Sequence, residues 1–274
     1  MSSRRRRRPL VEEAFCSTKR RREEDEAVEV RSSLQQLMML FSCQLFSDIL
    51  PPVALKHQLY SLHSDRTCVD KQLNALCESG ELLMFQLGFS TEAFALVFAD
   101  QYKAKVLQGE AGRETESSVQ KFLRALSTSC TSLSFDKHQL ITDLLFSDAE
   151  ITQLVKAGVL TVKDAGSWWL AIPNSGKFIK YLLEGRRAVL NMVKKSKYGE
   201  ILKNELEERR TTSKIKFKMK YHIHDLIGAE LVECVQTTSG TLLRYVDGSL
   251  ALVTHSSSKQ KELEVAQVLC VVSS

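Results

Sequence analysis

Residues 154–170 read LVKAGVLTVKDAGSWWL. The first letters complete a helix predicted over residues 148–157, and Gly158 supplies the left-handed residue with which helices commonly end. Two short apolar runs follow, Val159–Lys163 and Ser167–Ile172, with Asp164-Ala165-Gly166 as the turn between them. The stretch therefore predicts a helix that leads directly into a compact β-hairpin.

The same order of elements occurs on either side of this stretch. In the first copy Leu76, Gly80 and Leu82 repeat the spacing of Leu154, Gly158 and Leu160. A looser third copy runs through residues 224–231 into strands expected at 232–237 and 241–245, about a turn at 238–240. Apolar residues at helical spacing precede each hairpin. In the first copy they predict one helix from Ser32, a second after Pro51-Pro52 and a third over 67–79. In the second copy the predicted helices span 119–126, 135–144 and 148–157, and in the third they span 178–183, 187–195 and 198–208.

Three helices followed by a hairpin is the winged-helix layout. Repetition of one small unit at a fixed period indicates tandem domains rather than one large fold. The predicted fold class is therefore α+β and mostly α, with three tandem winged-helix domains that carry short β-hairpin wings. The predicted ranges are a disordered basic tail at 1–30, winged helices at 31–107, 117–175 and 176–245, and an extension of unknown structure at 246–274.

Charge is distributed very unevenly along the chain. Between Lys177 and Lys220, 14 Lys and Arg face five acids, which gives +9 in a chain whose net charge is +5. Residues 1–22 add +7, so the remainder carries −11. A basic block of this kind is typical of a protein that binds a polyanion, most commonly nucleic acid. The alternative interpretation is a solvated helix surface.

The N-terminal tail contains two basic clusters ten residues apart. They predict a bipartite nuclear-import signal and hence a nuclear protein, with a solvated basic arm as the alternative. No stretch is long and apolar enough for a membrane span, and the tail lacks the apolar region of a secretory signal. The residues assigned to import are Arg4, Arg5, Arg6, Arg7, Arg8, Lys19, Arg20, Arg21 and Arg22.

Motifs for catalysis or for cofactor binding are missing from the sequence. It contains no glycine-rich dinucleotide loop, complete P-loop, kinase catalytic loop, nucleophile elbow or zinc-protease motif. Asp164 followed by Gly166 weakly resembles a kinase metal-binding motif, but a hairpin turn accounts for both residues. His222 and His224 have only Cys234 nearby and alternate along an expected strand lead-in, so we expect them to be structural or surface residues. We predict a protein that is not an enzyme and needs no cofactor or metal.

Several segments resemble the family historically named serine/threonine protein kinase 19. They are residues 62–67, 157–171, 176–181, 221–228 and 237–244, so the resemblance covers roughly residues 32–244. The double tryptophan, Trp168-Trp169, in its turn-strand setting is the most specific of these features. This chain departs from the family in two places. Family members usually end soon after the Thr-Leu-Leu-Arg element at 241–244, whereas this chain continues to Ser274, and its N-terminal sequence differs from theirs.

The resemblance implies three winged helices that bind double-stranded DNA. It implies a role in transcription-coupled nucleotide excision repair, with stalled RNA polymerase II, Cockayne-syndrome factors and TFIIH as partners. The DNA-contacting bases of the family fall here on Lys180, Lys194, Lys197 and Arg209. Lys194 stands where an arginine is frequent, which keeps the charge but loses the planar fork. Lys177 and Lys195 belong to the same basic block, so they join the predicted DNA site.

The predicted mode of binding is largely independent of DNA sequence. Lys and Arg on helices neutralise phosphates, and phosphate contacts position a protein without reading bases. One interpretation of the two tryptophans is that they stack on exposed bases. The favoured interpretation places at least one ring in the core, because adjacent strand residues face opposite sides, and the outward ring would then mark a protein contact. A protein-interaction scaffold without DNA contact is the main alternative, a homodimer is possible, and a kinase is the least supported reading.

Overall fold

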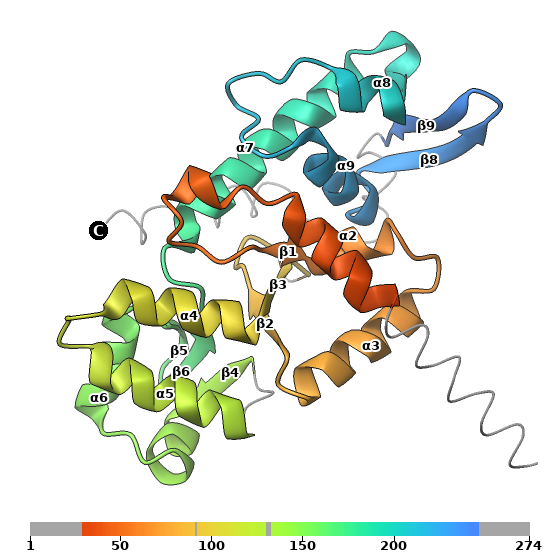
Figure 1. Cartoon of the computed structure of the whole chain (residues 1–274). Helices are drawn as coiled ribbons and strands as arrows, with labels where there is room; N and C mark the ends of the chain where they lie inside the picture. The colour runs from red at the N-terminus through yellow and green to blue at the C-terminus, as the bar shows by residue number, and fades with distance from the viewer. Residues whose placement is uncertain (1–28, 91, 130–132, 247–274) are drawn as a thin grey trace, which may run out of the picture.

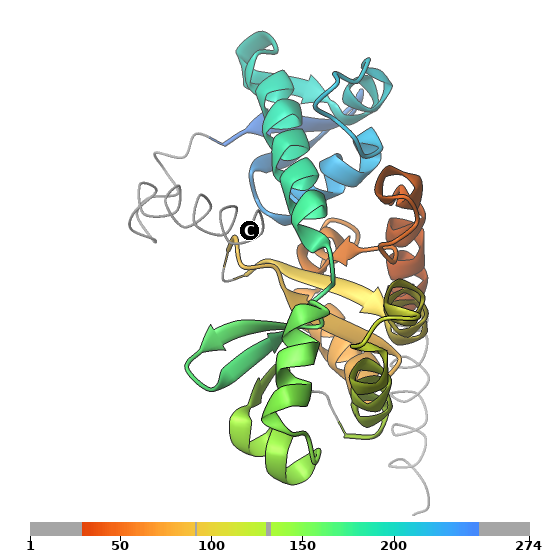
Figure 2. The same ribbon diagram turned by 90° about the vertical axis from the view of Figure 1, so that its left-hand side faces the viewer.

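The computed structural model describes residues 29–90, 92–129 and 133–246. The predicted import residues (Arg4–Arg8 and Lys19–Arg22) and nearly all of the extension at 246–274 lie outside these ranges. Figures 1 and 2 show the described chain as three units in a row, with the first unit between the second and the third.

The first unit begins with a helix over residues 29–39 and contains a three-stranded antiparallel sheet in the order β1-β3-β2. Asp65 caps α3 by accepting a hydrogen bond of 3.1 Å from the Cys68 backbone N–H. The short strand β1 was not predicted, because two residues show no periodicity. The other elements are η1 (Cys43–Phe46), β1 (Ala54–Leu55), α2 (Lys56–Tyr60), α3 (Arg66–Glu78), β2 (Leu82–Gln86) and β3 (Phe94–Phe98).

The second unit repeats this arrangement after the connecting helix α4 (Ala99–Glu110), which crosses the predicted boundary at residue 107. Its sheet has the order β4-β6-β5. The helix predicted over 135–144 is confirmed only in part: residues 137–143 are helical, with a π-helix at 139–143, but Phe135 lies in β4 opposite Trp168. Burial of Phe135 against Phe122 prevailed over the local apolar pattern. The elements are α5 (Glu116–Ser129), β4 (Ser134–Asp136), η2 (Gln139–Asp143), α6 (Asp148–Lys156), β5 (Leu160–Asp164) and β6 (Ser167–Leu170).

The third unit differs most from the sequence prediction. One helix, α7, replaces the two predicted over 178–183 and 187–195, and the helix predicted over 198–208 is a turn, a strand and a short helix. His222 and His224 lie in α9 and not in a strand lead-in. The sheet order β7-β9-β8 matches the other two units. The elements are α7 (Ser175–Lys194), η3 (Lys197–Gly199), β7 (Glu200–Leu202), α8 (Lys203–Glu208), α9 (Met219–Gly228), β8 (Val232–Thr237) and β9 (Gly240–Tyr245).

The three units confirm the predicted fold class. Each has a three-stranded antiparallel sheet whose first strand follows the first helix and whose last two strands form the hairpin after the last helix, which is the winged-helix order. One apolar cluster joins the units, since it contains Val97 of the first, Phe122 of the second, and Phe178 and Tyr221 of the third. The Tyr102 hydroxyl of α4 also donates a hydrogen bond of 2.8 Å to the Ala171 carbonyl. Among the described helices, none combines the length and the apolar character that a membrane span requires.

Candidate nucleic-acid interface

Helix α7 presents its basic residues along one exposed face. Its buried residues recur every three or four positions, namely Phe178, Leu182, Gly185, Val189 and Val193. The opposite positions are exposed and carry most of the helix's cations, interrupted by one acid at position 184. A helix of 20 residues is about 30 Å long, so this face extends along several phosphates of a nucleic-acid backbone. The exposed bases of the face are Lys177, Lys180, Arg187 and Lys194.

A second group of cations gathers where α7 ends. Lys194 lies with its Nζ 5.0 Å from the centre of the Tyr245 ring, and Lys197 lies 5.2 Å from the ring of Tyr198. Lys195 is exposed and forms no ion pair with the described part of the chain. Cations at a helix C-terminus are favoured by the helix dipole, so this cluster is stable without acidic partners.

Arg209 reaches the same place from the end of α8. Its Nη1 donates to the Ser196 hydroxyl at 3.4 Å, and its Nη2 pairs with Glu205 at 2.9 Å. The pair with Glu205 offsets its charge, so Arg209 contributes less to the positive field than the unpaired lysines do.

The structure thus divides the predicted DNA residues into two groups. Lys194, Lys195, Lys197 and Arg209 meet at the C-terminal end of α7. Lys180 and Lys177 lie about 20 to 25 Å from Lys194, near the N-terminal end of the helix.

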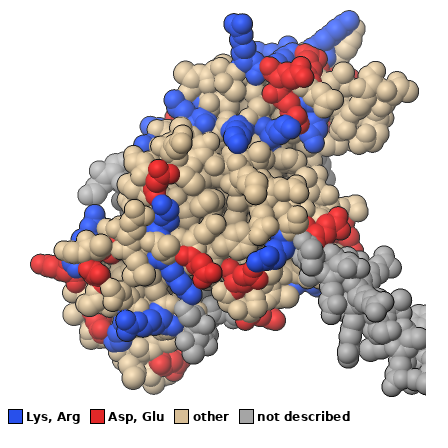
Figure 3. All heavy atoms as spheres, in the orientation of Figure 1, with Lys and Arg blue, Asp and Glu red and all other residues tan. Residues whose placement is uncertain are grey.

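Several exposed bases of the third unit belong to the predicted basic block but were not assigned to the DNA site. Arg187 was assigned to a separate helix, and it joins the lysine face only because α7 continues through Gly185. Lys214 and Lys216 are exposed and form no ion pair with described residues, whereas Lys220 pairs with Glu207 at 3.4 Å. In Figure 3 the blue spheres of Lys and Arg are dense over the third unit, beside a smaller group of acids.

Helix α9 occupies the position of the recognition helix, the last helix before the wing, but it is buried. In a helix-turn-helix protein this helix enters the major groove. Here it packs against α2 of the first unit, beside which it lies in Figure 1. A Cβ placed on Gly228 would lie 1.8 Å from the His57 carbonyl oxygen. The third unit therefore cannot insert α9 into DNA while the first unit is docked on it.

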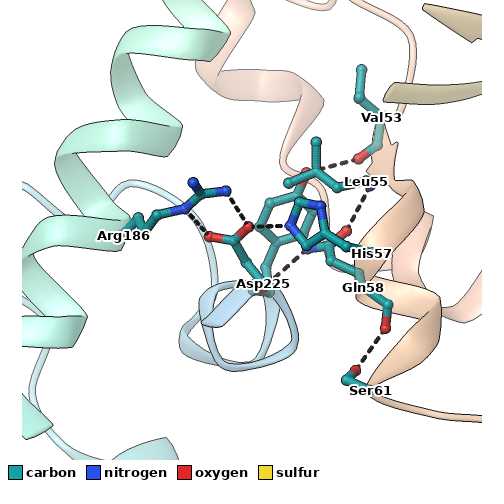
Figure 4. A network of polar contacts seen from close by, with 8 residues as sticks. Val53, Leu55, His57, Gln58, Ser61, Arg186 and Asp225 are labelled. Carbon is teal, nitrogen blue, oxygen red and sulfur yellow. Dashed lines mark hydrogen bonds and ion pairs between the residues drawn. The ribbon is translucent and has the colours of Figure 1, made fainter. Parts of the chain in front are cut away.

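An ion-pair network holds this contact in place (Figure 4). The Asp225 carboxylate receives two hydrogen bonds from Arg186, of 2.8 and 2.7 Å, and lies 2.7 Å from His57 Nε2. Burial by itself would raise the pKa of Asp225, but the charge of Arg186 and the hydrogen bond from His57 outweigh it and lower that pKa. Gln58 adds a hydrogen bond of 2.9 Å to the Tyr221 carbonyl. Asp225 is therefore ionised, and it links α2, α7 and α9.

His222 lies beside this network in a close apolar contact. Its ring fits against Gly185, where an added Cβ would lie 2.3 Å from Nε2. Neither ring nitrogen has a hydrogen-bond partner among the described residues. Burial lowers the pKa of His222 to about 4, so the ring is neutral at pH 7. Its role in the structure is packing.

The recognition helices of the other two units offer weaker anion sites. Helix α6 begins with Asp148 and Glu150, which would repel a phosphate backbone. On α3 the guanidinium of Arg66 is paired with Glu230. The basic face of α7 and its C-terminal cluster are therefore the best candidate for nucleic-acid contact in the described structure.

The two tryptophans of the second wing have different surroundings. Trp168 packs against the main apolar cluster, as expected for one of the pair. The Trp169 ring has Lys163 Nζ 4.3 Å from its centre. Asp164 ends β5 opposite Ser167, next to the hairpin turn.

Comparison with known proteins connects this architecture with repair. The model of the family described as inactive serine-threonine protein kinase 19 matches residues 27–245. Winged helix repair factor 1 of Homo sapiens is 50% identical over 219 residues, which cover 80% of this chain and 86% of that relative. The Mus musculus protein of the same name is 51% identical over 221 residues, covering 81% and 87%. That of Xenopus laevis is 44% identical over 212 residues, covering 77% and 82%.

The relatives' name combines the fold described above with a role in repair, and the family description agrees with the missing kinase motifs. This chain therefore belongs to the inactive serine-threonine protein kinase 19 family.

Proposed function

We propose that this protein is a non-enzymatic winged-helix repair factor that binds double-stranded DNA, largely independently of sequence, through its third unit. The observation that carries the proposal is the row of exposed cations along α7 and its C-terminal cluster, most of which form no ion pair with described residues. A row of unpaired lysines releases counterions from DNA phosphates when it binds, which is a favourable and salt-dependent contribution.

The geometry supports backbone contact rather than base reading. Because α9 is buried against α2, the surface that faces DNA is the side of α7 and the turn after it. Lysines predominate on this surface, and they contact phosphates as point charges. The proposed contact residues are Lys177, Lys180, Lys194, Lys195, Lys197 and Arg209.

We further propose that the protein acts in the nucleus, in transcription-coupled nucleotide excision repair. In this role it would bridge stalled RNA polymerase II, Cockayne-syndrome factors and TFIIH. The relatives named as repair factors and the family resemblance support this role. The third unit would hold DNA while the more acidic remainder of the chain binds proteins.

The experiment is fluorescence anisotropy with a 30-base-pair duplex of random sequence across a salt series. We expect the wild type to bind with a log–log salt slope near −4 to −5, which corresponds to about five neutralised phosphates. The variant K180E/K194E/K197E should lose at least about tenfold in affinity, and its remaining salt slope should be shallower.

A matched control carries the same change of charge elsewhere. Lys71, Lys103 and Lys156 lie on α3, α4 and α6 and form no ion pair with described residues. The variant K71E/K103E/K156E should keep most of the affinity. If the two triple variants lose affinity equally, the third unit is not the specific site. If no protein binds DNA, the scaffold function replaces this proposal, and the acidic first turn of α6 becomes the leading candidate for a protein contact.

A further inference from the structure

Tyr198 is the most exposed of the large apolar side chains in the described structure. It retains 84% of its accessible surface. It also has a φ of 60°, in the left-handed region that costs free energy for any residue with a Cβ. The tyrosine therefore contributes little burial to the fold, and its backbone conformation is an unfavourable one.

The turn that carries Tyr198 is firmly supported. The Ser196 hydroxyl donates to the Met192 carbonyl at 2.8 Å and accepts from Arg209, and the Gly199 N–H donates to the Ser196 carbonyl at 2.9 Å. Gly199 packs on Tyr245, whose Cβ would lie 3.7 Å from a Cβ built there. The turn is thus fixed between α7 and β9, and the Tyr198 ring projects from it into solvent.

The surroundings of this ring are cationic. Lys197 Nζ lies 5.2 Å from the ring centre, and Lys194 and Lys195 end the preceding helix. An exposed aromatic ring within a cluster of unpaired lysines is the arrangement with which proteins bind unpaired nucleotides: the cations follow the backbone and the ring stacks on a base. A protein contact at the same place would need acidic side chains on the partner to match the lysines.

We propose that Tyr198 stacks on an unpaired base, so that the third unit prefers DNA in which the duplex is locally opened. This inference rests on the proposed function and adds a substrate class to it. The lysines supply affinity for the backbone of any duplex. Tyr198 supplies an additional contact only where a base has left the helix, because a paired base has no free face for the ring.

The test compares two DNA molecules with the same number of phosphates. One is a fully paired 30-base-pair duplex, and the other has about six mispaired bases at its centre, including a fluorescent 2-aminopurine. Because backbone charge is equal, a difference in affinity reports base contact rather than phosphate contact. One stacked base corresponds to a preference of roughly fivefold or more for the opened duplex.

Two substitutions of Tyr198 test whether the aromatic ring or the hydroxyl group makes the contact. Y198F should keep the preference and the change in 2-aminopurine fluorescence on binding. Y198A should lose both, while its affinity for the paired duplex and its salt slope stay within about twofold of the wild type, since no charge has changed.

The outcomes separate a failure of base stacking by Tyr198 from a failure of DNA binding by the third unit. If the wild type binds both DNA molecules equally, or if Y198A keeps the preference, the stacking role is wrong while duplex binding stands. If none of the proteins binds either DNA, the proposed function and the stacking role both fall.

Discussion

At the residue scale, the folded structure disfavours protonation of the two histidines of α9, His222 and His224. Burial lowers the pKa of both His222 and His224 to about 4. At His222 the charge of Asp225 opposes this decrease and that of Arg186 adds to it. At His224 the charges of Lys203 and Lys220 add to the decrease and that of Glu207 opposes it. Both rings bind protons more readily in the unfolded chain, whose histidine pKa is about 6.5. Their contribution to stability is therefore complete above about pH 6.5 and is lost as pH falls towards 4.

We expect the free energy of unfolding to fall by about 1 kcal/mol per buried histidine between pH 7.5 and 5.5. Urea denaturation at each pH measures it. The variant H224Q keeps a polar group near the Ser61 hydroxyl, 2.7 Å from His224 Nδ1, and should reduce the fall by roughly half. H138Q, at an exposed position of the second unit, should leave it unchanged. An unaltered pH dependence in H224Q would show that His224 does not carry this effect.

At the element scale, the close approach of α9 to α2 decides how the first and third units are joined. Gly228 makes that approach possible, because any Cβ there would overlap a backbone oxygen of α2 that cannot rotate away. We expect Gly228→Ala to lower the free energy of unfolding by about 3 kcal/mol or more, since the helices must separate and disturb the Asp225 network. Chemical denaturation followed by circular dichroism measures the change.

Gly109→Ala is the matched control for this substitution. Gly109 lies in α4 with nothing within 4 Å of an added Cβ. Alanine has the higher helix propensity, so this variant should be as stable as the wild type or up to about 1 kcal/mol more stable. Wild-type stability in Gly228→Ala would mean that α2 and α9 do not pack closely in solution.

At the scale of the whole molecule, one apolar cluster packs the three winged helices against one another, beside a second cluster within the first unit and a third within the third unit. Residues from all three units belong to the same apolar cluster, and Asp225 ties the third unit to the first. We therefore expect one cooperative thermal transition. Circular dichroism, which reports on every helix, and tryptophan fluorescence, which reports only on the second unit, should give the same midpoint. Two separated midpoints would show that the units unfold independently.

Prediction from sequence succeeded where the signal was local. The spacing of Leu154, Gly158 and Leu160 located α6 and its hairpin, and the helix predicted over 67–79 matches α3. The charge count identified the basic block before its geometry was known. Prediction failed at Phe135 and at α7, because a strand partner 33 residues away and a histidine packed on Gly185 leave no mark on the local pattern.

The sequence by itself determined the helix–hairpin units, their threefold repetition and the concentration of positive charge in the third, since periodicity, turn residues and charge act over short distances along the chain. Only the tertiary structure decided which basic residues are exposed together, that α9 is buried, and that Tyr198 projects from the basic cluster. Those properties depend on which surfaces meet: Asp225 pairs with Arg186 39 residues away and with His57 168 residues away. Burial and pairing across such separations are fixed by packing and not by local sequence.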